Sequence, residues 1–180
     1  VLLSDVHLGI YNGAKHLESV VNAVNAAQPD LVVIAGDLFD GSQAGAYFDR
    51  KAAAAQFRRI QAPDGVVFAA GNHDPATIDP SLRTFLRESR ISMLHDGGLA
   101  LGPLVIFGRN DAISVREPDR RRPLQMVVSG YPHNHPMIVV DHNPQGADEA
   151  AACGADLVLC GHTHRGQLFP VTLFTKWAYG

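Results

Sequence analysis

The sequence has few cysteines, no long hydrophobic run and no excess of basic residues. Two cysteines in 180 residues exclude a disulfide-stapled scaffold and a four-cysteine zinc site. No apolar run approaches the roughly 20 residues of a membrane-spanning helix. The 15 Lys and Arg are outnumbered by 18 Asp and Glu, for a formal net charge of -3. This balance argues against a broad nucleic-acid-binding surface.

The remaining composition is that of a folded domain with metal-binding potential. Hydrophobic residues make up 46% and charged residues 18% of the chain, which excludes an intrinsically disordered protein. Nine histidines are many beside 15 Lys and Arg, and they point toward metal or phosphate chemistry. We expect one catalytic domain over residues 1–180. Residue 1 already lies in a predicted core strand, so we also expect this domain to be trimmed at both ends.

Short apolar runs alternate with helical stretches, which is typical of an α/β fold. The unbroken run Leu31–Ala35 predicts a strand that is buried on both faces. In the middle of the chain, short strands separated by turns favour antiparallel pairing. We expect strands at residues 1–3, 31–35, 66–69, 99–101, 104–107, 124–128, 137–140 and 157–160, and helices near residues 17–24, 49–61, 80–90 (which Ser81 can cap) and 148–153.

Five small polar blocks come directly after predicted strands. Ligands of α/β proteins collect outside the carboxyl ends of strands, so the five blocks are expected to share one site. The blocks are Asp5-Val6-His7, Gly36-Asp37, Gly71-Asn72-His73-Asp74, His142-Asn143 and Gly161-His162-Thr163-His164.

Carboxylate, imidazole and amide groups together suit Mn, Fe or Zn rather than calcium. Side chains two residues apart on an extended segment point the same way, so Asp5 with His7, and His162 with His164, can each converge on one point. Seven candidate ligands are more than one ion uses, so we expect two divalent ions with Asp37 as the bridge; Mn is expected first, with Fe or Zn as alternatives. Such a charged, water-activating site suits phosphate ester hydrolysis.

These blocks, in this order, resemble the calcineurin-like metallophosphoesterases, and the resemblance covers residues 4–168. The resemblance implies an α/β protein with a four-layer α/β/β/α sandwich and two mixed sheets. It also implies a ligand set for each ion. The first ion would be held by Asp5, His7, Asp37 and His164, and the second by Asp37, Asn72, His142 and His162.

The family mechanism assigns roles to the residues beside the ligands. It implies in-line attack by a metal-bridging hydroxide, while His73 protonates the leaving oxygen and Asp74 orients His73. Asn72 is also expected to contact the substrate, and Arg165 is a candidate for binding its phosphate. His142 is preferred over His133 and His135 as the lone ligand because it directly ends the strand Met137–Val140.

Two departures place the chain within the superfamily. Asp37 is followed by Leu-Phe-Asp-Gly rather than the Asp-Arg-Gly of the protein phosphatases, which argues against that activity. The run from Gly161 to Gln167 resembles the GHTHxGQ signature of a bacterial-type branch that is often membrane-tethered. That branch implies a phosphodiester or lipid-headgroup substrate and membrane association through a segment outside this chain; a cytoplasmic location is the alternative.

Two other functions stay open at this point. One is a nuclease or cyclic-nucleotide phosphodiesterase of the same superfamily, although the acidic balance speaks against a nucleic-acid partner. The other is a non-catalytic interaction scaffold, which the complete ligand set disfavours. The oligomeric state, the natural substrate and the side of any membrane do not follow from the sequence.

Overall fold

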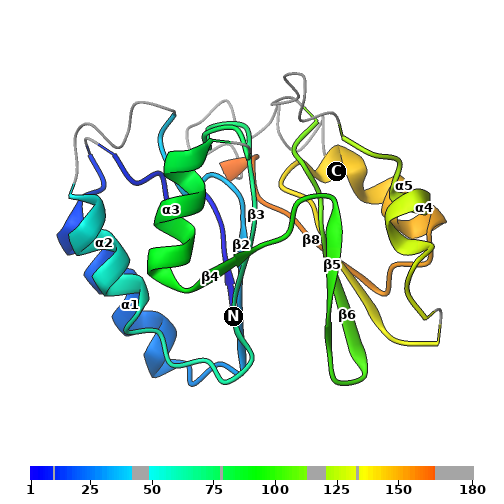
Figure 1. The fold of residues 1–180 in the computed structure, drawn as a ribbon, viewed down its shortest axis with the longest axis horizontal. Coiled ribbons are helices and arrows are strands. Elements are labelled where there is room, and N and C mark those ends of the chain that lie inside the picture. Colours follow the sequence, from blue (N-terminus) through cyan, green and yellow to red (C-terminus); the bar gives the residue numbers. More distant parts are fainter. Residues whose placement is uncertain (10, 42–48, 78, 113–120, 133, 165–180) are drawn as a thin grey trace.

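The computed structural model describes residues 1–9, 11–41, 49–77, 79–112, 121–132 and 134–164. In these residues two four-stranded sheets pack face to face, and helices cover the outer face of each sheet (Figure 1). The layers therefore run helix, sheet, sheet, helix, which is the four-layer α/β/β/α arrangement expected from the sequence. Within the described residues, no helix is both long and apolar enough to cross a membrane.

The first sheet has the strand order β1-β2-β3-β4, and all of its neighbouring strands run parallel. Parallel neighbours need crossover connections, and here helices supply them on the outer face of the sheet. The strands are β1 (Leu2–Leu3), β2 (Leu31–Ala35), β3 (Gly65–Ala69) and β4 (Ile91–Met93), and the helices are α1 (Ala14–Ala26), α2 (Arg50–Phe57) and α3 (Pro80–Ser89).

The second sheet has the order β5-β6-β7-β8 and is mixed. Strands β5 and β6 form an antiparallel hairpin, whereas β6, β7 and β8 run parallel. The mixed pairing expected for both sheets is thus found in the second, while the four described strands of the first are parallel. The elements are β5 (Gly97–Leu101), β6 (Leu104–Gly108), α4 (Leu124–Val128), β7 (Met137–Val140), a 3-10 turn η2 (Pro144–Gly146), α5 (Ala147–Ala152) and β8 (Leu157–Leu159).

The apolar residues form three clusters that hold the four layers together. Strand β2 shows why its sequence does not alternate: Val32 and Ile34 pack toward the helices, while Val33 and Ala35 face the second sheet. Both faces of the strand are therefore buried, as the unbroken apolar run predicts. A third cluster, which includes Phe107 of β6, packs beneath α4 and α5.

Three local predictions differ from the structure. The predicted strand at Leu124–Val128 is wrong, because these residues form α4. Leu124, Val127 and Val128 are buried, and that spacing fits one face of a helix as well as a short strand. Helix α3 is capped by Asp79, whose carboxylate accepts from the Ser81 main chain at 2.7 Å, rather than by the Ser81 side chain. Strand β4 was not predicted, since three residues are too few to show a period.

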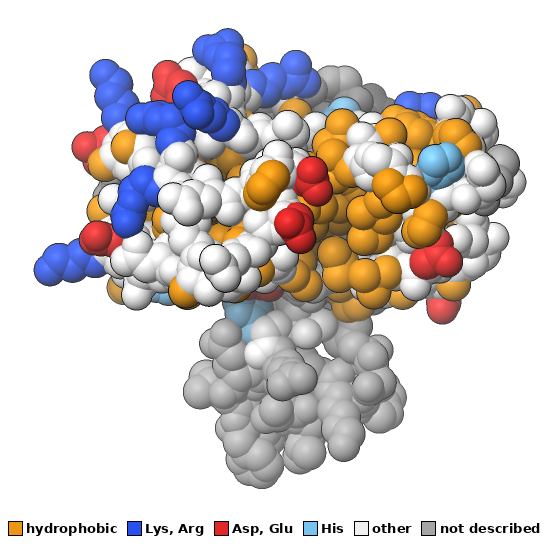
Figure 2. Space-filling model, turned by 90° about the horizontal axis from the view of Figure 1, so that it is seen from below, with side chains coloured by type: hydrophobic (Ala, Val, Ile, Leu, Met, Phe, Trp, Pro, Cys, Tyr) orange, Lys and Arg blue, Asp and Glu red, His pale blue; other side chains and the backbone are white. Residues whose placement is uncertain are grey.

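Among the described residues, the edge strands β1 and β8 leave part of the inter-sheet layer exposed. Their register with β2 and β7 places Leu2 and Leu157 level with inward-facing residues, yet these side chains are 43% and 48% exposed. Seen from below, hydrophobic side chains gather on the side of the second sheet, and Lys and Arg gather over the helices of the first (Figure 2).

Candidate metal centre

The carboxyl ends of five strands meet at one edge of the two sheets, the upper edge in Figure 1. Polar residues follow each of these strands, because a loop at a strand end can present side chains without burying its own backbone groups. The candidate residues follow β1 (Asp5, His7), β2 (Asp37), β3 (Asn72, His73), β7 (His142) and β8 (His162, His164).

Five of these residues have an unusual backbone conformation. The structure has eight described non-glycine residues with positive φ, and five of them are candidate ligands. This conformation costs about 1–2 kcal/mol for a residue with a side chain, so its concentration here marks a functional site. The five are Asp5 (φ 55°), His7 (48°), Asp37 (51°), His162 (73°) and His164 (47°).

Two glycines allow the loops of the centre to approach each other. Gly36 has a φ of 81°, and a Cβ atom on it would lie 2.5 Å from the Nδ1 atom of His142. A Cβ atom on Gly71 would lie 2.3 Å from Oδ1 of Asp37. Any larger residue at either position would therefore push a candidate ligand out of place.

Asp5, His7 and His164 form a first group whose ligand atoms all lie within 4.8 Å of one another. The Nε2 atoms of His7 and His164 are 3.3 Å apart, and Nε2 of His164 lies 3.2 Å from Oδ1 of Asp5. Burial lowers the pKa of His7; Asp37 opposes this effect, and the neighbouring imidazoles reinforce it. The neutral imidazole that results is the form that binds metals.

Asp37 and His142 form the buried floor of the centre, with exposures of 2% and 0%. His142 Nδ1 donates to the Ala35 carbonyl at 2.7 Å, which turns Nε2 toward Oδ2 of Asp37 at 3.1 Å. That Nε2 atom is close enough for an ion pair but has no aligned hydrogen-bond partner among the described residues. With Asp5, the two residues form a second group within 4.8 Å.

The charges of Asp37 and His142 depend strongly on each other. Burial alone would raise the pKa of Asp37. His142 and the His73 main-chain N–H, which donates to Oδ1 at 2.9 Å, together outweigh burial, so the pKa of Asp37 lies below its ordinary value. Burial lowers the pKa of His142, but Asp37 and the Ala35 carbonyl outweigh this and raise it to about 9. A cation at this point would compete with the His142 proton for the Nε2 lone pair.

Asn72 and His162 also lie beside each other, with Asn72 Oδ1 2.9 Å from His162 Nδ1. The main-chain N–H of His162 donates to both Asp5 oxygens at 3.2 Å, and the rings of His162 and His142 are 5.3 Å apart. These contacts connect the residues after β3 and β8 to both groups. The structure thus brings all seven predicted ligands to one edge of the sandwich.

The donor set fits divalent cations. It combines buried and half-buried carboxylates with imidazoles and one amide, and it includes no thiolate. The buried His142 nitrogen without an aligned partner is what a bound cation would satisfy. Two overlapping groups that share Asp5 provide room for more than one ion.

Asp74, which is expected to orient His73, contacts main-chain groups in the structure. Its two oxygens accept the main-chain N–H groups of Phe39 and Gly71 at 2.9 and 2.8 Å, so its carboxylate fixes the loops rather than the His73 ring. Burial raises the pKa of Asp74 to about 7, although these two hydrogen bonds oppose the shift. The turn after His73 directs the Asp74 side chain into the protein, where it is 8% exposed. This direction explains why the Asp74 carboxylate meets main-chain groups.

Asp40 is the carboxylate that faces His73, and the sequence analysis did not single it out. Its Oδ1 atom lies 3.6 Å from His73 Nδ1 and 3.8 Å from His7 Nδ1, and the three residues form a third group of potential ligands. His73 and Asp40 are about half exposed, so they lie at the rim of the centre. The signal was present in the sequence, since Asp40 follows Asp37 by three residues in the same loop.

Other predicted residues lie elsewhere. Arg165, the predicted phosphate ligand, and His133 are outside the described residues. His135 is partly buried and donates from Nδ1 to the Pro103 carbonyl at 2.7 Å, so it belongs to the far end of the β5–β6 hairpin and not to the centre. The structure places His142, and not His135, beside Asp5 and Asp37.

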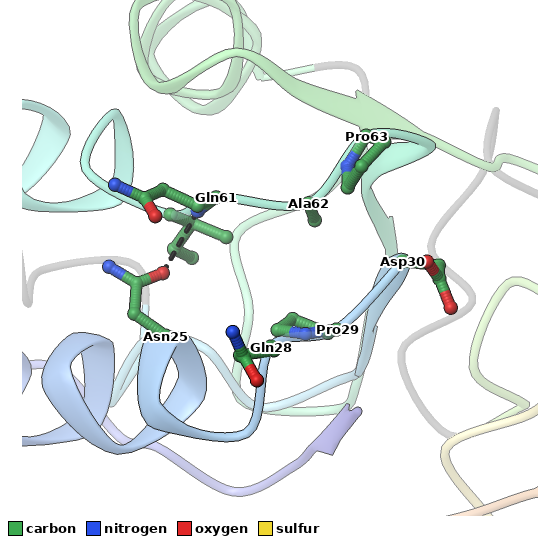
Figure 3. A pocket seen from close by; sticks show the side chains of 8 residues that line it. Asn25, Gln28, Pro29, Asp30, Gln61, Ala62 and Pro63 are labelled. Carbon is green, nitrogen blue, oxygen red and sulfur yellow. Dashed lines mark hydrogen bonds between the residues drawn. The ribbon is translucent and has the colours of Figure 1, made fainter.

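A cavity of about 550 Å³ lies at the opposite edge, near the amino ends of β2 and β3 (Figure 3). The main-chain N–H of Gln61 donates to the Asn25 side chain there at 2.9 Å, which ties the loop before β3 to α1. No histidine lines this cavity. Its residues are Asn25, Gln28, Pro29, Asp30, Ile60, Gln61, Ala62 and Pro63.

Comparison with known proteins finds one family. A profile described as calcineurin-like phosphoesterase matches residues 1–166. A protein of Danio rerio named transmembrane protein with metallophosphoesterase domain is 36% identical over 96% of this chain and 41% of its own length. A Bos taurus protein of the same name is 31% identical over 96% and 41%. A Campylobacter jejuni protein named as an uncharacterized metallophosphoesterase is 29% identical over 100% and 47%. The chain thus spans less than half the length of these relatives.

Proposed function

The chain belongs to the calcineurin-like phosphoesterase family, and from this premise we propose that it hydrolyses phosphate esters with the help of two divalent cations. The observation that carries the proposal is the buried pair of Asp37 and His142, whose Nε2 atom faces the carboxylate at 3.1 Å without an aligned hydrogen bond. A non-catalytic scaffold would have no reason to keep such a costly pair beside four other imidazoles.

The cations, when bound, would supply charge neutralisation for the phosphoryl group and an activated water molecule. The residues that would hold them are Asp5, His7, Asp37, Asn72, His142, His162 and His164. Mn is the expected metal, and Fe and Zn suit the same oxygen and nitrogen ligands.

His73 is proposed to protonate the leaving oxygen. Its ring stands 5.0 Å from the ring of His7, in an edge-to-face arrangement, and is exposed enough to meet a substrate. Its main chain is fixed by the hydrogen bond to Asp37, and its Nδ1 atom faces Asp40. An alkoxide leaving group needs such a proton donor at neutral pH.

We propose a phosphodiester, including a lipid headgroup, as the preferred substrate, with Arg165 binding its phosphate. The resemblance to the membrane-tethered branch supports this preference, and two relatives are named as transmembrane proteins. Membrane association would then come from sequence outside these 180 residues. The net charge of -3 supports a small substrate rather than a nucleic acid.

A substrate panel tests the proposal. The purified protein would be assayed with an aryl phosphodiester, an aryl phosphomonoester, a cyclic nucleotide, DNA and a nucleotide-linked lipid, each with Mn, Fe or Zn. We expect turnover that a chelator abolishes, that favours diesters and that is lost in the Asp37→Asn variant. Absence of metal-dependent turnover on every ester would refute the hydrolase, and cleavage of DNA alone would establish the nuclease alternative.

A further inference from the structure

The turn that carries His142 is held from one side by Arg121. Arg121 donates from Nη1 to Oδ1 of Asp141 at 3.1 Å and from Nη2 to Oδ2 at 2.5 Å, so the pair is bidentate. The same Nη1 also donates to the Asn110 carbonyl at 2.9 Å. A planar guanidinium with two bonds to one carboxylate fixes direction as well as distance.

Asp141 connects this contact to the metal centre because it directly precedes His142. Its side chain is 1% exposed, and its main-chain N–H donates to the Leu159 carbonyl at 3.0 Å. The His142 carbonyl in turn accepts from the Gly161 N–H at 3.0 Å. The peptide groups on both sides of the Asp141–His142 bond are therefore locked to the end of β8, beside His162.

Gly146 shows that the turn is shaped around this pair. A Cβ atom on Gly146 would lie 1.9 Å from Oδ2 of Asp141 and 2.8 Å from Nη2 of Arg121. The φ of this residue needs no glycine, since it lies at -78°. The absence of a side chain is therefore explained by the close approach of the ion pair, which is an observation independent of the hydrogen bonds.

The carboxylate of Asp141 cannot stay where it is without Arg121. A buried charge that loses its partner is strongly destabilised, so the Asp141 side chain must move. Movement of Asp141 would turn the adjoining peptide and shift His142, whose Nδ1 and Nε2 atoms face Ala35 and Asp37 at 2.7 and 3.1 Å. Small shifts at a metal ligand reduce affinity markedly.

We infer that Arg121 is a positioning residue for the metal centre: its bidentate pair with Asp141 holds His142 in the orientation that a cation needs. The inference rests on the proposed function, since it assigns His142 as a ligand. Arg121 does not belong to the predicted ligand set, and it acts through Asp141 rather than on substrate.

The neighbouring residues provide matched controls. The Arg122 main-chain N–H donates to Asp96 at 2.8 Å, and the Arg122 carbonyl accepts from Arg109 at 2.8 Å. Arg122→Gln therefore preserves both hydrogen bonds and removes a positive charge next to Arg121. Arg121→Lys keeps the charge and loses the planar fork. Asp141→Asn removes the buried charge while keeping an oxygen that Arg121 can bond.

The first measurement uses the protein without added metal. Nuclear magnetic resonance would follow the His142 Nδ1 proton, which the 2.7 Å bond to Ala35 protects from exchange with water. We expect faster exchange in Arg121→Gln and unchanged exchange in Arg122→Gln. Equal protection in all three proteins would overturn the inference, whatever the fate of the hydrolase proposal.

The second measurement is the Mn affinity of the same proteins, with their free energies of unfolding as a check on folding. We expect Arg121→Gln to lose about 10- to 100-fold in affinity, Arg121→Lys to lose part of that, and Arg122→Gln to match the wild type. Adding Asp141→Asn to Arg121→Gln should reduce the Mn affinity by a smaller factor than Asp141→Asn does in the wild type, because the ion pair is already broken. Wild-type affinity in Arg121→Gln, or additive effects, would contradict a positioning role. Failure of the wild type to bind Mn would instead refute the proposed function.

Discussion

His73 and Asp37 occupy different environments in the same small centre. His73 lies about half exposed at the rim, whereas Asp37 is 2% exposed on the floor and accepts the His73 main-chain N–H. A side chain at the rim can reach a substrate, and one on the floor can hold a cation. This division of environments is the basis for separating the proton donor from the ligands.

Replacement of His73 by Ala should reduce turnover of alkyl phosphate esters by about 10²- to 10⁴-fold while the bound metal stays in place. The reason is that the proposed proton donor is removed, whereas the hydrogen bond to Asp37 comes from the main chain of residue 73 and remains. Turnover of an activated aryl ester should fall much less, since that leaving group needs no proton. Metal analysis and the two assays together check the prediction; equal losses on both esters would contradict it.

Replacement of Asp40 by Asn should produce a smaller loss, about 10- to 100-fold, with the same dependence on the leaving group. The carboxylate faces His73 Nδ1 at 3.6 Å and is proposed to orient the ring. Asp74→Asn is the contrasting variant, because Asp74 bonds to the main chain at Phe39 and Gly71; it should lower the free energy of unfolding without changing the leaving-group dependence. If Asp74→Asn showed the leaving-group dependence and Asp40→Asn did not, Asp74 would be the residue that orients His73.

The sequence predicts the identity of the clustered residues well and their fine roles poorly. Asp5, His7, Asp37, His142, His162 and His164 could be found because each follows an apolar strand, and strand ends meet at one edge. The position of Asp40 beside His73, and of Asp74 against the main chain, could not be found from the sequence, because both residues lie in loops where side-chain direction depends on turn geometry. Sequence spacing alone does not fix that direction.

At the scale of the elements, α4 shows what short segments conceal. The run Leu124–Val128 is apolar and partly β-branched, so it predicts a strand as readily as a helix. A tertiary contact favours the helix. The Leu124 N–H donates to Glu149 Oε1 at 2.7 Å, which gives a hydrogen-bond partner to a main-chain N–H in the first turn. The longer helices and buried strands carry enough residues to show their period, and those predictions were confirmed.

Glu149 gives this element a pH dependence. Burial raises the pKa of Glu149, but the Leu124 N–H, Arg109 and Arg121 outweigh it and hold the pKa below its ordinary value of 4.5. The folded state therefore binds fewer protons than the unfolded state, so the stability gained is complete above pH 4.5 and is lost as pH falls through the folded-state value. The free energies of unfolding of the wild type and of Glu149→Gln should differ near pH 7 and converge toward pH 3. A difference in free energy that grows in acid would contradict this prediction.

At the scale of the whole molecule, the centre joins the two sheets. Asp5, His7 and Asp37 come from the first sheet, and His142, His162 and His164 come from the second. Contacts such as His142 with Asp37, at 3.1 Å, therefore connect the two sheets at the carboxyl ends of their strands. A cation held by both sheets would bind the folded state and not the unfolded chain.

Added Mn should therefore stabilise the protein by about 2.7 kcal/mol when its free concentration is 100 times its dissociation constant. Chemical unfolding with and without Mn, followed by a chelator, measures this gain. Asp37→Asn should remove most of it. Asp30→Asn, at the opposite edge (Figure 3), should leave it unchanged, and an equal loss in both variants would show that Mn acts nonspecifically.

Anomalous diffraction from crystals grown with Mn would locate every bound ion in one measurement. We expect two peaks on either side of the Asp37 carboxylate, one within reach of Asp5, His7 and His164 and the other within reach of His142. Peaks remote from Asp37, or density in which His142 Nε2 bonds only to protein atoms, would contradict a shared two-ion centre.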